Sequence, residues 1–381
     1  MNSLFRIRAI TLKELHQLKR DRLTFGMVVM IPLIQLLLFG FAINTNVRHL
    51  PVGLLDFSNS AFSQNLVQSI TATQVVDFRK RYDSVEEAER AITRGEVKAV
   101  LVLPHDMAKR LSRHPLITSQ VAMPADDKFH RPIGQWIVDG SDTIVASALN
   151  RLRNMPLEDG RGILSRATMN TFEIVFYFNP EQRSVVNIVP GLVAVILTMT
   201  MIMFTSAAIV REKERGNMEF LITTPMRPIE LMIGKIIPYI IIGLIQLTIV
   251  LGLGKFVFNV PIRGDISQIF LASLLFICAS LTLGLIISTM ATSQLQSMQM
   301  TVFILLPSIL LSGFMFPYEG MPELAQWIAE ILPATHFVRM IRAITLREAH
   351  LFDVGKDAIW LVGFTMIGLL IASRRFKKRL D

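Results

Sequence analysis

Long apolar stretches alternate with charged segments along this chain. Five stretches contain no Asp, Glu, Lys or Arg: 23–47, 184–210, 236–254, 266–318 and 358–373. A membrane-spanning helix needs roughly 20 predominantly apolar residues. Each stretch reaches about that length alone or with its flanking residues, so the pattern predicts an integral membrane protein.

The stretch 266–318 is long enough for two spans. Uncharged polar residues interrupt it, and we place a break at Ser293, Gln294, Gln296, Ser297 and Gln299. The pattern therefore predicts six transmembrane helices: 23–43, 185–209, 236–256, 266–290, 299–317 and 355–373. The first exceeds a signal-peptide core of about 7–15 residues, and no small-residue cleavage site follows it. We expect it to remain as an anchor.

Basic residues gather in segments that a six-span topology places on one side of the membrane. Residues 1–22, 211–235 and 374–381 together carry 16 basic and seven acidic residues, an excess equal to the net charge of the whole chain, +9. Cytoplasmic loops are the basic ones. The pattern predicts cytoplasmic termini and an outer segment at 44–183. The basic charge thus indicates topology and gives no reason to propose nucleic-acid binding.

Composition agrees with a membrane protein. Hydrophobic residues make up 51% and charged residues 18% of the chain, whereas soluble proteins carry about 25% charged residues. A disordered chain and an ordinary cytosolic enzyme are therefore excluded as first choices. The one cysteine, Cys278, lies in a predicted span, so the outer segment holds no disulfide.

The outer segment 44–183 is long enough to fold alone. Ser84 to Glu87 has the form of a helix capping box, and 99–103 has the composition of a buried strand that stops at Pro104. The order of its runs predicts a small α/β domain. Strands are expected at 52–56, 75–82, 99–103, 117–123 and 136–139, and helices at 58–71, 84–95, 105–113 and 143–154.

Two segments outside the spans are also expected to contact the membrane. In residues 1–22, Arg6, Lys13 and Arg20 share one helix face, which is typical of a cytoplasmic interfacial amphipathic helix. A basic flank that only sets topology is the alternative. Residues 318–354 are expected to form an outer re-entrant or amphipathic segment.

Polar and small residues inside the spans have two interpretations each. Three polar side chains either line a substrate path or form interhelical hydrogen bonds: Gln35, Asn187 and Gln246. Pro190 and Gly191 weaken the helix ladder and can hinge the second span. A stripe of small residues four apart predicts a close approach of another helix: Ser280, Gly284 and Ser288.

Familiar catalytic motifs are absent from the sequence. It contains no G-x-x-x-x-G-K-[ST], H-E-x-x-H, C-x-x-C or G-x-S-x-G, so no ATPase, metalloprotease or serine hydrolase site is indicated. The predicted spans hold no charged residue in their interiors, and ion-coupled carriers usually need one there. We expect a non-enzymatic chain whose energy comes from another subunit.

The loop 211–235 carries the most informative sequence. Its first part reads R-E-K-E-R-G-N-M-E-F-L-I-T-T-P over 211–225. This order, in which a charged turn is followed by a glycine break, a short apolar helix and a proline, predicts a compact structure that projects into the cytoplasm. A solvated loop between two spans is the alternative on pattern alone.

This loop resembles the coupling segment of type-2 ABC exporter permeases, R-E-x-E-x-G-T-x-E-x-L-x-x-[ST]-P. Eight residues match: Arg211, Glu212, Glu214, Gly216, Glu219, Leu221, Thr224 and Pro225. Asn217 replaces the usual Thr. Other stretches agree with the family along the whole chain: 179–180, 189–192, 311–317 with Ser312 and Gly313, 321–322, and 332–337 followed by Arg339 and Arg342.

The resemblance implies a multidrug-export permease with a large extracytoplasmic domain, in the bacterial inner membrane. Such a permease pairs with a second, identical or similar permease, and a separate ATPase subunit receives the coupling segment. Glu212, Glu214 and Glu219 would meet basic groups of that partner, and Phe220 and Leu221 would fill an apolar groove. ATP and Mg would bind the partner, and no cofactor or metal would bind this chain.

Three functions are weighed. The first is export of an amphiphilic or drug-like molecule from the cytoplasm or inner leaflet, because the predicted path lacks charged side chains. The second is a mechanotransmitting ABC subunit that acts on an envelope partner without transport. The third is a receptor with a ligand-binding outer domain, although the longest cytoplasmic segment is only about 25 residues. Membrane lipid is an expected partner, and a periplasmic adaptor protein stays open.

Overall fold

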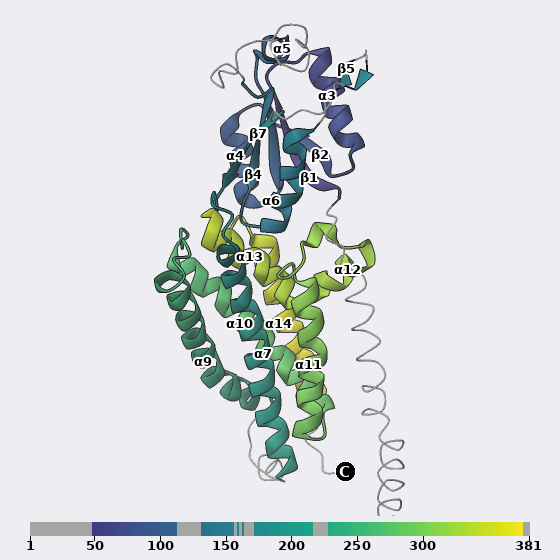
Figure 1. Cartoon of the computed structure of the whole chain (residues 1–381). Coiled ribbons are helices and arrows are strands. Elements are labelled where there is room, and N and C mark those ends of the chain that lie inside the picture. The colour runs from purple at the N-terminus through teal and green to yellow at the C-terminus, as the bar shows by residue number, and fades with distance from the viewer. Residues whose placement is uncertain are drawn as a thin grey trace, which may run out of the picture.

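The structure is a computed structural model that describes residues 48–112, 131–155, 158–159, 162–163, 171–215 and 228–375. These residues form a sheet with its helices and a group of long helices (Figure 1). The predicted interfacial helix 1–22, the first span 23–43, the strand 117–123 and residues 376–381 of the tail lie outside the described residues.

The sheet has five strands in the order β2-β1-β3-β4-β7. β1 (Leu50–Asp56) runs parallel to both β2 (Val76–Arg81) and β3 (Ala99–Leu103). β4 (Gly134–Asp139) pairs antiparallel with β3 and parallel with β7 (Phe172–Tyr177). β7 is not among the predicted strands, although its sequence, F-E-I-V-F-Y, is rich in the aromatic and β-branched residues typical of strands. A short hairpin joins β5 (Glu158–Asp159) and β6 (Gly162–Ile163).

Helices cover both faces of this sheet. Alternate residues of β3 point to opposite faces, so Leu101 packs with α3 (Ala61–Ala72) and α6 (Thr143–Asn150), and Val100 packs with α4 (Val85–Arg94). The predicted cap of α4 is confirmed, because the Ser84 hydroxyl accepts from the backbone N of Glu87 at 3.2 Å. α6 ends earlier than predicted and passes into a 3-10 turn, η2 (Arg151–Asn154). α5 (Met107–Ser112) follows β3. We call the sheet together with its covering helices, from β1 to β7, the sheet part.

Asp56 organises the turn after β1. Its carboxylate is 1% exposed and accepts hydrogen bonds from the Ser63 hydroxyl at 2.7 Å, the Ser58 hydroxyl at 2.8 Å and the backbone N of Asn59 at 3.1 Å. Burial by itself raises the pKa of the Asp56 carboxyl, but the hydrogen bonds from Ser63 and Ser58 outweigh it and lower the pKa below its ordinary value. The folded state therefore favours the charged carboxylate.

We expect the sheet part to lose stability in acid, and Asp56→Asn to remove part of that dependence. A pKa lowered by folding contributes stability that is present above the unfolded pKa, about 3.9, and is lost as the pH falls through the lower folded value. Thermal unfolding from pH 7 downward measures this. Asp56→Asn should be less stable at neutral pH, and its profile should be flatter below about pH 4. Asp83→Asn, at an exposed position, is the control, and equal profiles for both variants would contradict the assignment.

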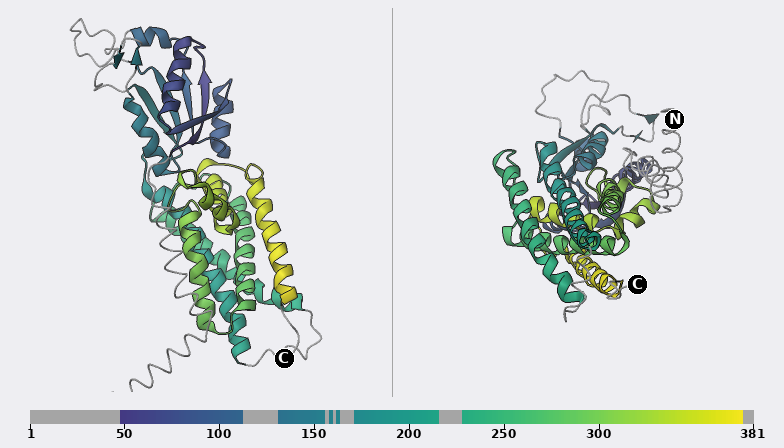
Figure 2. Two further views of the ribbon diagram at one scale, coloured as in Figure 1. Left: turned by 90° about the vertical axis from the view of Figure 1, so that its right-hand side faces the viewer. Right: turned by 90° about the horizontal axis from the view of Figure 1, so that it is seen from below.

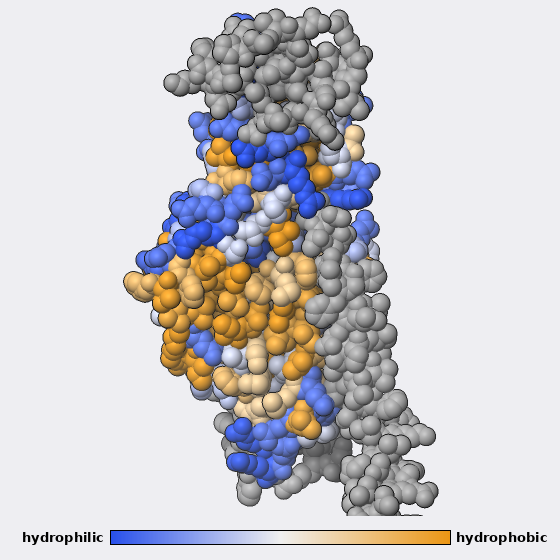
Figure 3. All heavy atoms as spheres, in the orientation of Figure 1, coloured by the Kyte–Doolittle hydropathy of each residue, from blue (hydrophilic) through white to orange (hydrophobic). Residues whose placement is uncertain are grey.

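Among the described residues, five helices are long and apolar enough to cross a membrane. They are α7 (Ser184–Glu214), α9 (Pro228–Phe256), α10 (Ile266–Met290), α11 (Gln294–Leu311) and α14 (Gly355–Arg375). Figure 3 shows an apolar band over these helices between hydrophilic zones at both ends. The observed bounds of α10 coincide with the predicted ones, and α7 continues five residues past its predicted end at 209.

α11 corrects the predicted fifth span. We predicted 299–317, with a polar break before it, but the helix begins at Gln294 and ends at Leu311. The Ser293 hydroxyl caps it by accepting from the backbone N of Gln296 at 3.2 Å, so the polar residues form its first turns. Gly313 has a positive φ of 81° just beyond its end, a conformation that glycine adopts without strain.

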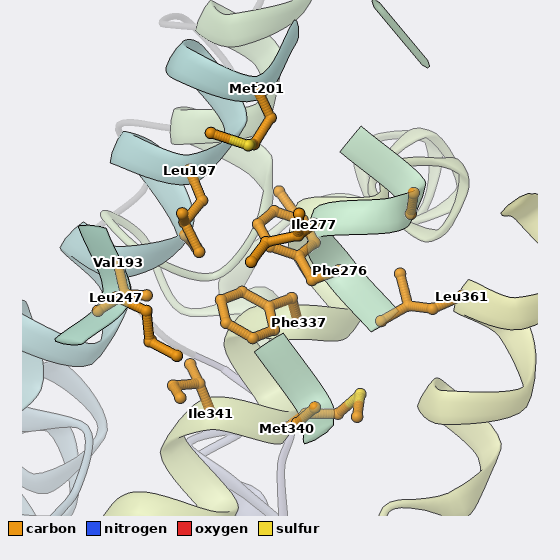
Figure 4. Close-up of a cluster of buried hydrophobic side chains, with 14 of the residues drawn as sticks. Val193, Leu197, Met201, Leu247, Phe276, Ile277, Phe337, Met340, Ile341 and Leu361 are labelled. Carbon is orange, nitrogen blue, oxygen red and sulfur yellow. The ribbon is translucent and has the colours of Figure 1, made fainter. Parts of the chain in front are cut away.

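Two short helices connect α11 to α14. α12 (Glu323–Ile331) exposes Leu324, Trp327 and Ile331, whereas α13 (Pro333–Arg347) is buried along nearly its whole length. Phe337 of α13 stacks on Phe276 of α10, with ring centroids 4.2 Å apart, inside the core of the long helices (Figure 4). Figures 1 and 2 place α13 where the sheet part meets the long helices. A buried helix thus joins the two parts.

Candidate functional site

The predicted coupling segment begins on the last turn of α7, at the end of the long helices away from the sheet part (Figure 1). Glu214 accepts two hydrogen bonds from Gln294, from its backbone N at 2.9 Å and from its side-chain amide at 2.5 Å. Arg211 donates its Nε–H to the Gln294 side-chain oxygen at 3.3 Å. A carboxylate at a helix N-terminus also satisfies unpaired backbone N–H groups. The end of α7 is therefore joined to the start of α11.

The same turn also contacts the end of α10. Lys213 donates its ammonium to the carbonyl of Ala291, just past α10, at 3.4 Å. Glu212 lies on the same turn, between Arg211, which contacts Gln294, and Lys213, which contacts Ala291. The other predicted coupling residues lie outside the described residues: Gly216, Glu219, Phe220, Leu221 and Pro225. Their role in coupling stays a prediction.

The predicted hinge lies in the first turns of α7. Pro190 and Gly191 are inside the helix and buried. Gly191 faces the Phe314 ring so closely that a Cβ atom would overlap it. Asn187, one turn earlier, is buried, and its side-chain oxygen has no hydrogen-bond partner among the described residues. Close packing against Phe314 is therefore sufficient to explain a glycine at position 191, without a hinge in α7.

Gln246 forms an interhelical hydrogen bond. The hydroxyl of Thr200 in α7 donates to its side-chain oxygen in α9 at 2.8 Å. Of the two interpretations, this contact favours the interhelical bond over a substrate path. Gln35, for which the same two interpretations stand, lies outside the described residues.

Ser312 and Gly313 form the turn that ends α11. The Ser312 hydroxyl accepts from the backbone N of Phe314 at 3.4 Å. The carbonyl of Gly313 accepts from the Arg342 guanidinium at 2.9 Å, and that of Phe314 accepts from the same guanidinium at 3.3 Å. The carbonyls of the turn that follows α11 are thus satisfied by a side chain of α13. Ser312 and Gly313 therefore lie in a turn that Arg342 holds against α13.

A comparison with known protein families identifies the chain. The family described as ABC-2 family transporter protein matches residues 22–374. The chain belongs to the ABC-2 transporter family. Because the match covers residues 22–374, family membership rests on nearly the whole chain and on more than the coupling motif.

Several relatives of this ABC-2 chain are bacterial permeases. The probable multidrug ABC transporter permease YbhS of Escherichia coli is 28% identical over 384 aligned residues, covering 99% of this chain and 98% of the relative. The probable multidrug ABC transporter permease YbhR of the same organism is 27% identical and covers 91% of each chain. The inner membrane transport permease YhhJ of Escherichia coli is 34% identical over 49% of this chain and 51% of its own length.

We expect Gly191→Leu to destabilise the folded ABC-2 protein by roughly 1–3 kcal/mol, the usual effect of overpacking a filled site. The new side chain would displace the Phe314 ring from α7. Thermal unfolding in detergent measures the loss. Phe314→Ala in the same background should restore part of it, and Gly363→Leu on α14, where a Cβ meets nothing within 4 Å, is the control. An unchanged Gly191→Leu protein would contradict the packing.

Sequence reasoning missed the partners of several site residues. The polar pattern predicts Gln294 in a break between spans, and the family motif contains Phe314 without indicating what it contacts. Both partners lie far along the chain from the residues they contact, since Glu214 and Gln294 are 80 residues apart. A polar residue at the start of an apolar helix is a signal for a cap or a contact with a neighbouring helix end.

Proposed function

We propose that this chain is the permease subunit of an ATP-driven exporter and that a separate ATPase subunit supplies the energy. The observation that carries the proposal is the joined end of α7, α10 and α11, from which the predicted coupling segment departs. A force on that segment would reach three long helices at once. The family and the multidrug names of two relatives support the same function.

The proposed orientation puts this joined end in the cytoplasm. The C-terminal ends of α7 and α14 lie at the end of the long helices opposite the sheet part (Figures 1 and 2). Both ends are basic, with Arg211 and Lys213 on one and Arg374 and Arg375 on the other. Basic ends favour the cytoplasm. The sheet part would then be extracytoplasmic, in a protein of the bacterial inner membrane.

We propose an amphiphilic or drug-like cargo that leaves the cytoplasm or inner leaflet. The long helices have apolar interiors whose polar groups are hydroxyls and amides. Such a path suits a molecule with a large apolar surface. A second permease, identical or similar, would complete the path, and a periplasmic adaptor could dock on the sheet part. ATP and Mg would bind the ATPase subunit.

We expect Glu219→Lys to weaken capture of the ATPase subunit roughly tenfold or more, as when one partner of a charge pair at an interface is reversed. The test is a pull-down of the candidate ATPase with detergent-solubilised permease. Glu181→Lys reverses a charge at an exposed position of the described chain, beside the sheet part, and should leave capture intact. If the wild type captures no ATPase, the proposal loses its energy source. Equal capture by both variants would remove Glu219 from the interface.

Mechanical transmission is a second candidate, favoured by the contacts between the sheet part and the segments that connect α11 to α14. Lys98 pairs with Glu319 at 3.0 Å and Arg347 with Asp139 at 3.2 Å across this boundary. Such ties would carry movement of α13 to the sheet part. ATP hydrolysis and uptake into inverted vesicles, measured with and without a candidate substrate, distinguish export from mechanical transmission. Substrate-stimulated hydrolysis with uptake supports export, and ATP hydrolysis that no substrate stimulates supports transmission.

A further inference from the structure

An apolar groove with a volume of about 290 Å³ runs along α14. α14 is the least buried of the five long helices, and Figure 2 shows it at the edge of their group. The larger side chains of the groove are all apolar: Trp360, Phe364, Ile367 and Ile371 of α14, and Ile286 of α10. We call this hollow the α14 groove.

Two glycines of α14 give the groove its shape. A Cβ atom on Gly368 would lie 2.5 Å from the Cγ2 atom of Thr282, so glycine at this position lets α14 approach α10 closely. Five residues earlier, a Cβ atom on Gly363 would meet nothing within 4 Å. Gly363 therefore leaves open space beside the rings of Trp360 and Phe364, and the close contact at Gly368 forms the floor of the groove.

Stacked aromatic rings fix the end of the groove that is nearer to the sheet part. Trp360 stacks on the ring of His336 in α13 with centroids 4.1 Å apart, and on Phe364 with centroids 5.2 Å apart. The His336 ring is held in turn, because its Nδ1 atom contacts the Asp357 carboxylate at 2.6 Å. The groove is thus formed before any ligand enters it, which lowers the ordering cost of binding.

The length of the groove suits a lipid chain. From Trp360 to Ile371, α14 rises about 16 Å at about 1.5 Å per residue. The hydrocarbon core of a bilayer is about 30 Å thick, so the acyl chains of one leaflet extend about 15 Å. A phospholipid whose headgroup lies at the C-terminal end of α14 would therefore place most of one acyl chain in the groove.

Two basic side chains lie at that C-terminal end. Arg374 and Arg375 follow Ile371 by three and four residues, so they share its helix face. Both are exposed, and neither has a carboxylate partner among the residues that the structure describes. Guanidinium groups match phosphate oxygens through paired N–H donors. A phosphate at this level would supply the missing negative charge, and its acyl chain would enter the groove.

We propose that the α14 groove binds one acyl chain of an anionic phospholipid whose phosphate lies at Arg374 and Arg375. The lipid belongs to the leaflet on the side away from the sheet part. A second copy of this chain fits the groove less well, because a two-fold contact through α14 would bring both pairs of arginines together at the same end. The site does not depend on the proposed export function.

The test is quenching of Trp360 fluorescence by phospholipids that carry bromine near the free end of the acyl chain. Bromine quenches an indole at short range. The chain has three tryptophans; Trp136 is buried in the sheet part, so Trp327→Phe leaves Trp360 as the indole that a lipid chain can reach. This full-length parent protein is titrated in detergent with brominated phosphatidylglycerol, which is anionic, and with brominated phosphatidylcholine, which carries no net charge.

We expect phosphatidylglycerol to reach half-maximal quenching at a mole fraction roughly tenfold lower than phosphatidylcholine does, because two basic residues favour the anionic headgroup. Arg374→Gln combined with Arg375→Gln should raise the mole fraction of phosphatidylglycerol needed by roughly tenfold for the same reason. Arg215→Gln, an exposed basic position just past α7 at the same end of the long helices, is the control and should leave the titration unchanged.

A second variant tests the position of the acyl chain. Gly363→Leu fills the groove with an apolar side chain, and we expect it to remove most of the quenching. Gly252→Leu on α9 is the matched control, because a Cβ atom there also meets nothing within 4 Å, and it should leave the quenching intact. The two arginine substitutions change exposed positions, so they test the site even if Gly363→Leu does not fold.

Three results would overturn the proposal. Equal quenching by both lipids, unchanged in the double arginine variant, would show ordinary contact with the bilayer. Quenching that persists in folded Gly363→Leu would place the acyl chain outside the groove. No quenching of the parent protein by either lipid would show that another segment of the chain or a second copy covers the groove.

Discussion

Arg347→Ala is expected to destabilise the folded protein by about 3–5 kcal/mol. The Arg347 side chain is 8% exposed and its Asp139 partner 1% exposed, with the two charged groups 3.2 Å apart. Alanine would leave the Asp139 carboxylate buried, and the backbone N–H of Ser141 would be its only remaining hydrogen-bond donor among the described residues. A buried charge without its partner is among the most costly changes a protein can undergo. Thermal and chemical unfolding in detergent measure the loss.

Two further variants separate this ion pair from an ordinary surface contact. Arg94→Ala breaks the pair with Asp353 at 3.0 Å, but the Arg94 side chain is 51% exposed, so we expect a loss of less than about 1 kcal/mol. The double variant Arg347→Gln with Asp139→Asn removes both charges and should recover much of the stability. If Arg347→Ala is as mild as Arg94→Ala, the pair is not buried in solution.

Gly284→Leu should separate α7 from α10 and reduce stability by about 3 kcal/mol, the upper end of ordinary overpacking. A Cβ on Gly284 would lie 2.9 Å from the carbonyl oxygen of Ile202 and 3.0 Å from the Cβ of Thr205. The obstacle is backbone and not a flexible side-chain end, so α7 itself has to move. Transport or ATPase coupling that depends on α7 should fall with it.

Gly252→Leu is the matched control for this prediction. Gly252 lies in α9, where a Cβ meets nothing within 4 Å. Leucine there gains helix propensity of up to about 1 kcal/mol over glycine and adds an apolar side chain. We expect a neutral or stabilising effect on Tm. A similar loss in both variants would show that leucine perturbs any helix of this protein, whatever its neighbours.

The stripe that contains Gly284 is a case in which sequence alone was sufficient. Ser280, Gly284 and Ser288 follow one another at four-residue intervals; the structure buries all three, and Gly284 lies against α7. Four residues make about one helical turn, so small residues at that spacing share a face whatever lies around the helix. The capping of α4 by Ser84 was predictable for the same reason, because a cap involves residues three apart.

The bounds of α11 show where the pattern misled. Hydropathy favoured the apolar part of the stretch and excluded Gln294 and Ser297. Hydropathy describes how a side chain partitions on average, whatever it contacts in the fold. At the first residue of α11, the polar groups of Gln294 have a partner in Glu214 of α7. Gln294, Gln296, Ser297 and Gln299 therefore belong to α11, and the break between the two helices is only 291–293.

The membrane character, the helices α7, α9, α10 and α14, most strands of the sheet part and the family could all be predicted from the amino-acid sequence, because they follow from local periodicity, charge distribution and motifs. Three features became visible only in the folded chain: α13 is buried between the two parts, Gly191 faces Phe314, and Arg347 meets Asp139 from 208 residues away. Arginine and aspartate are common surface residues in any sequence. Their burial depends on which segments the fold brings together, and no local pattern records that.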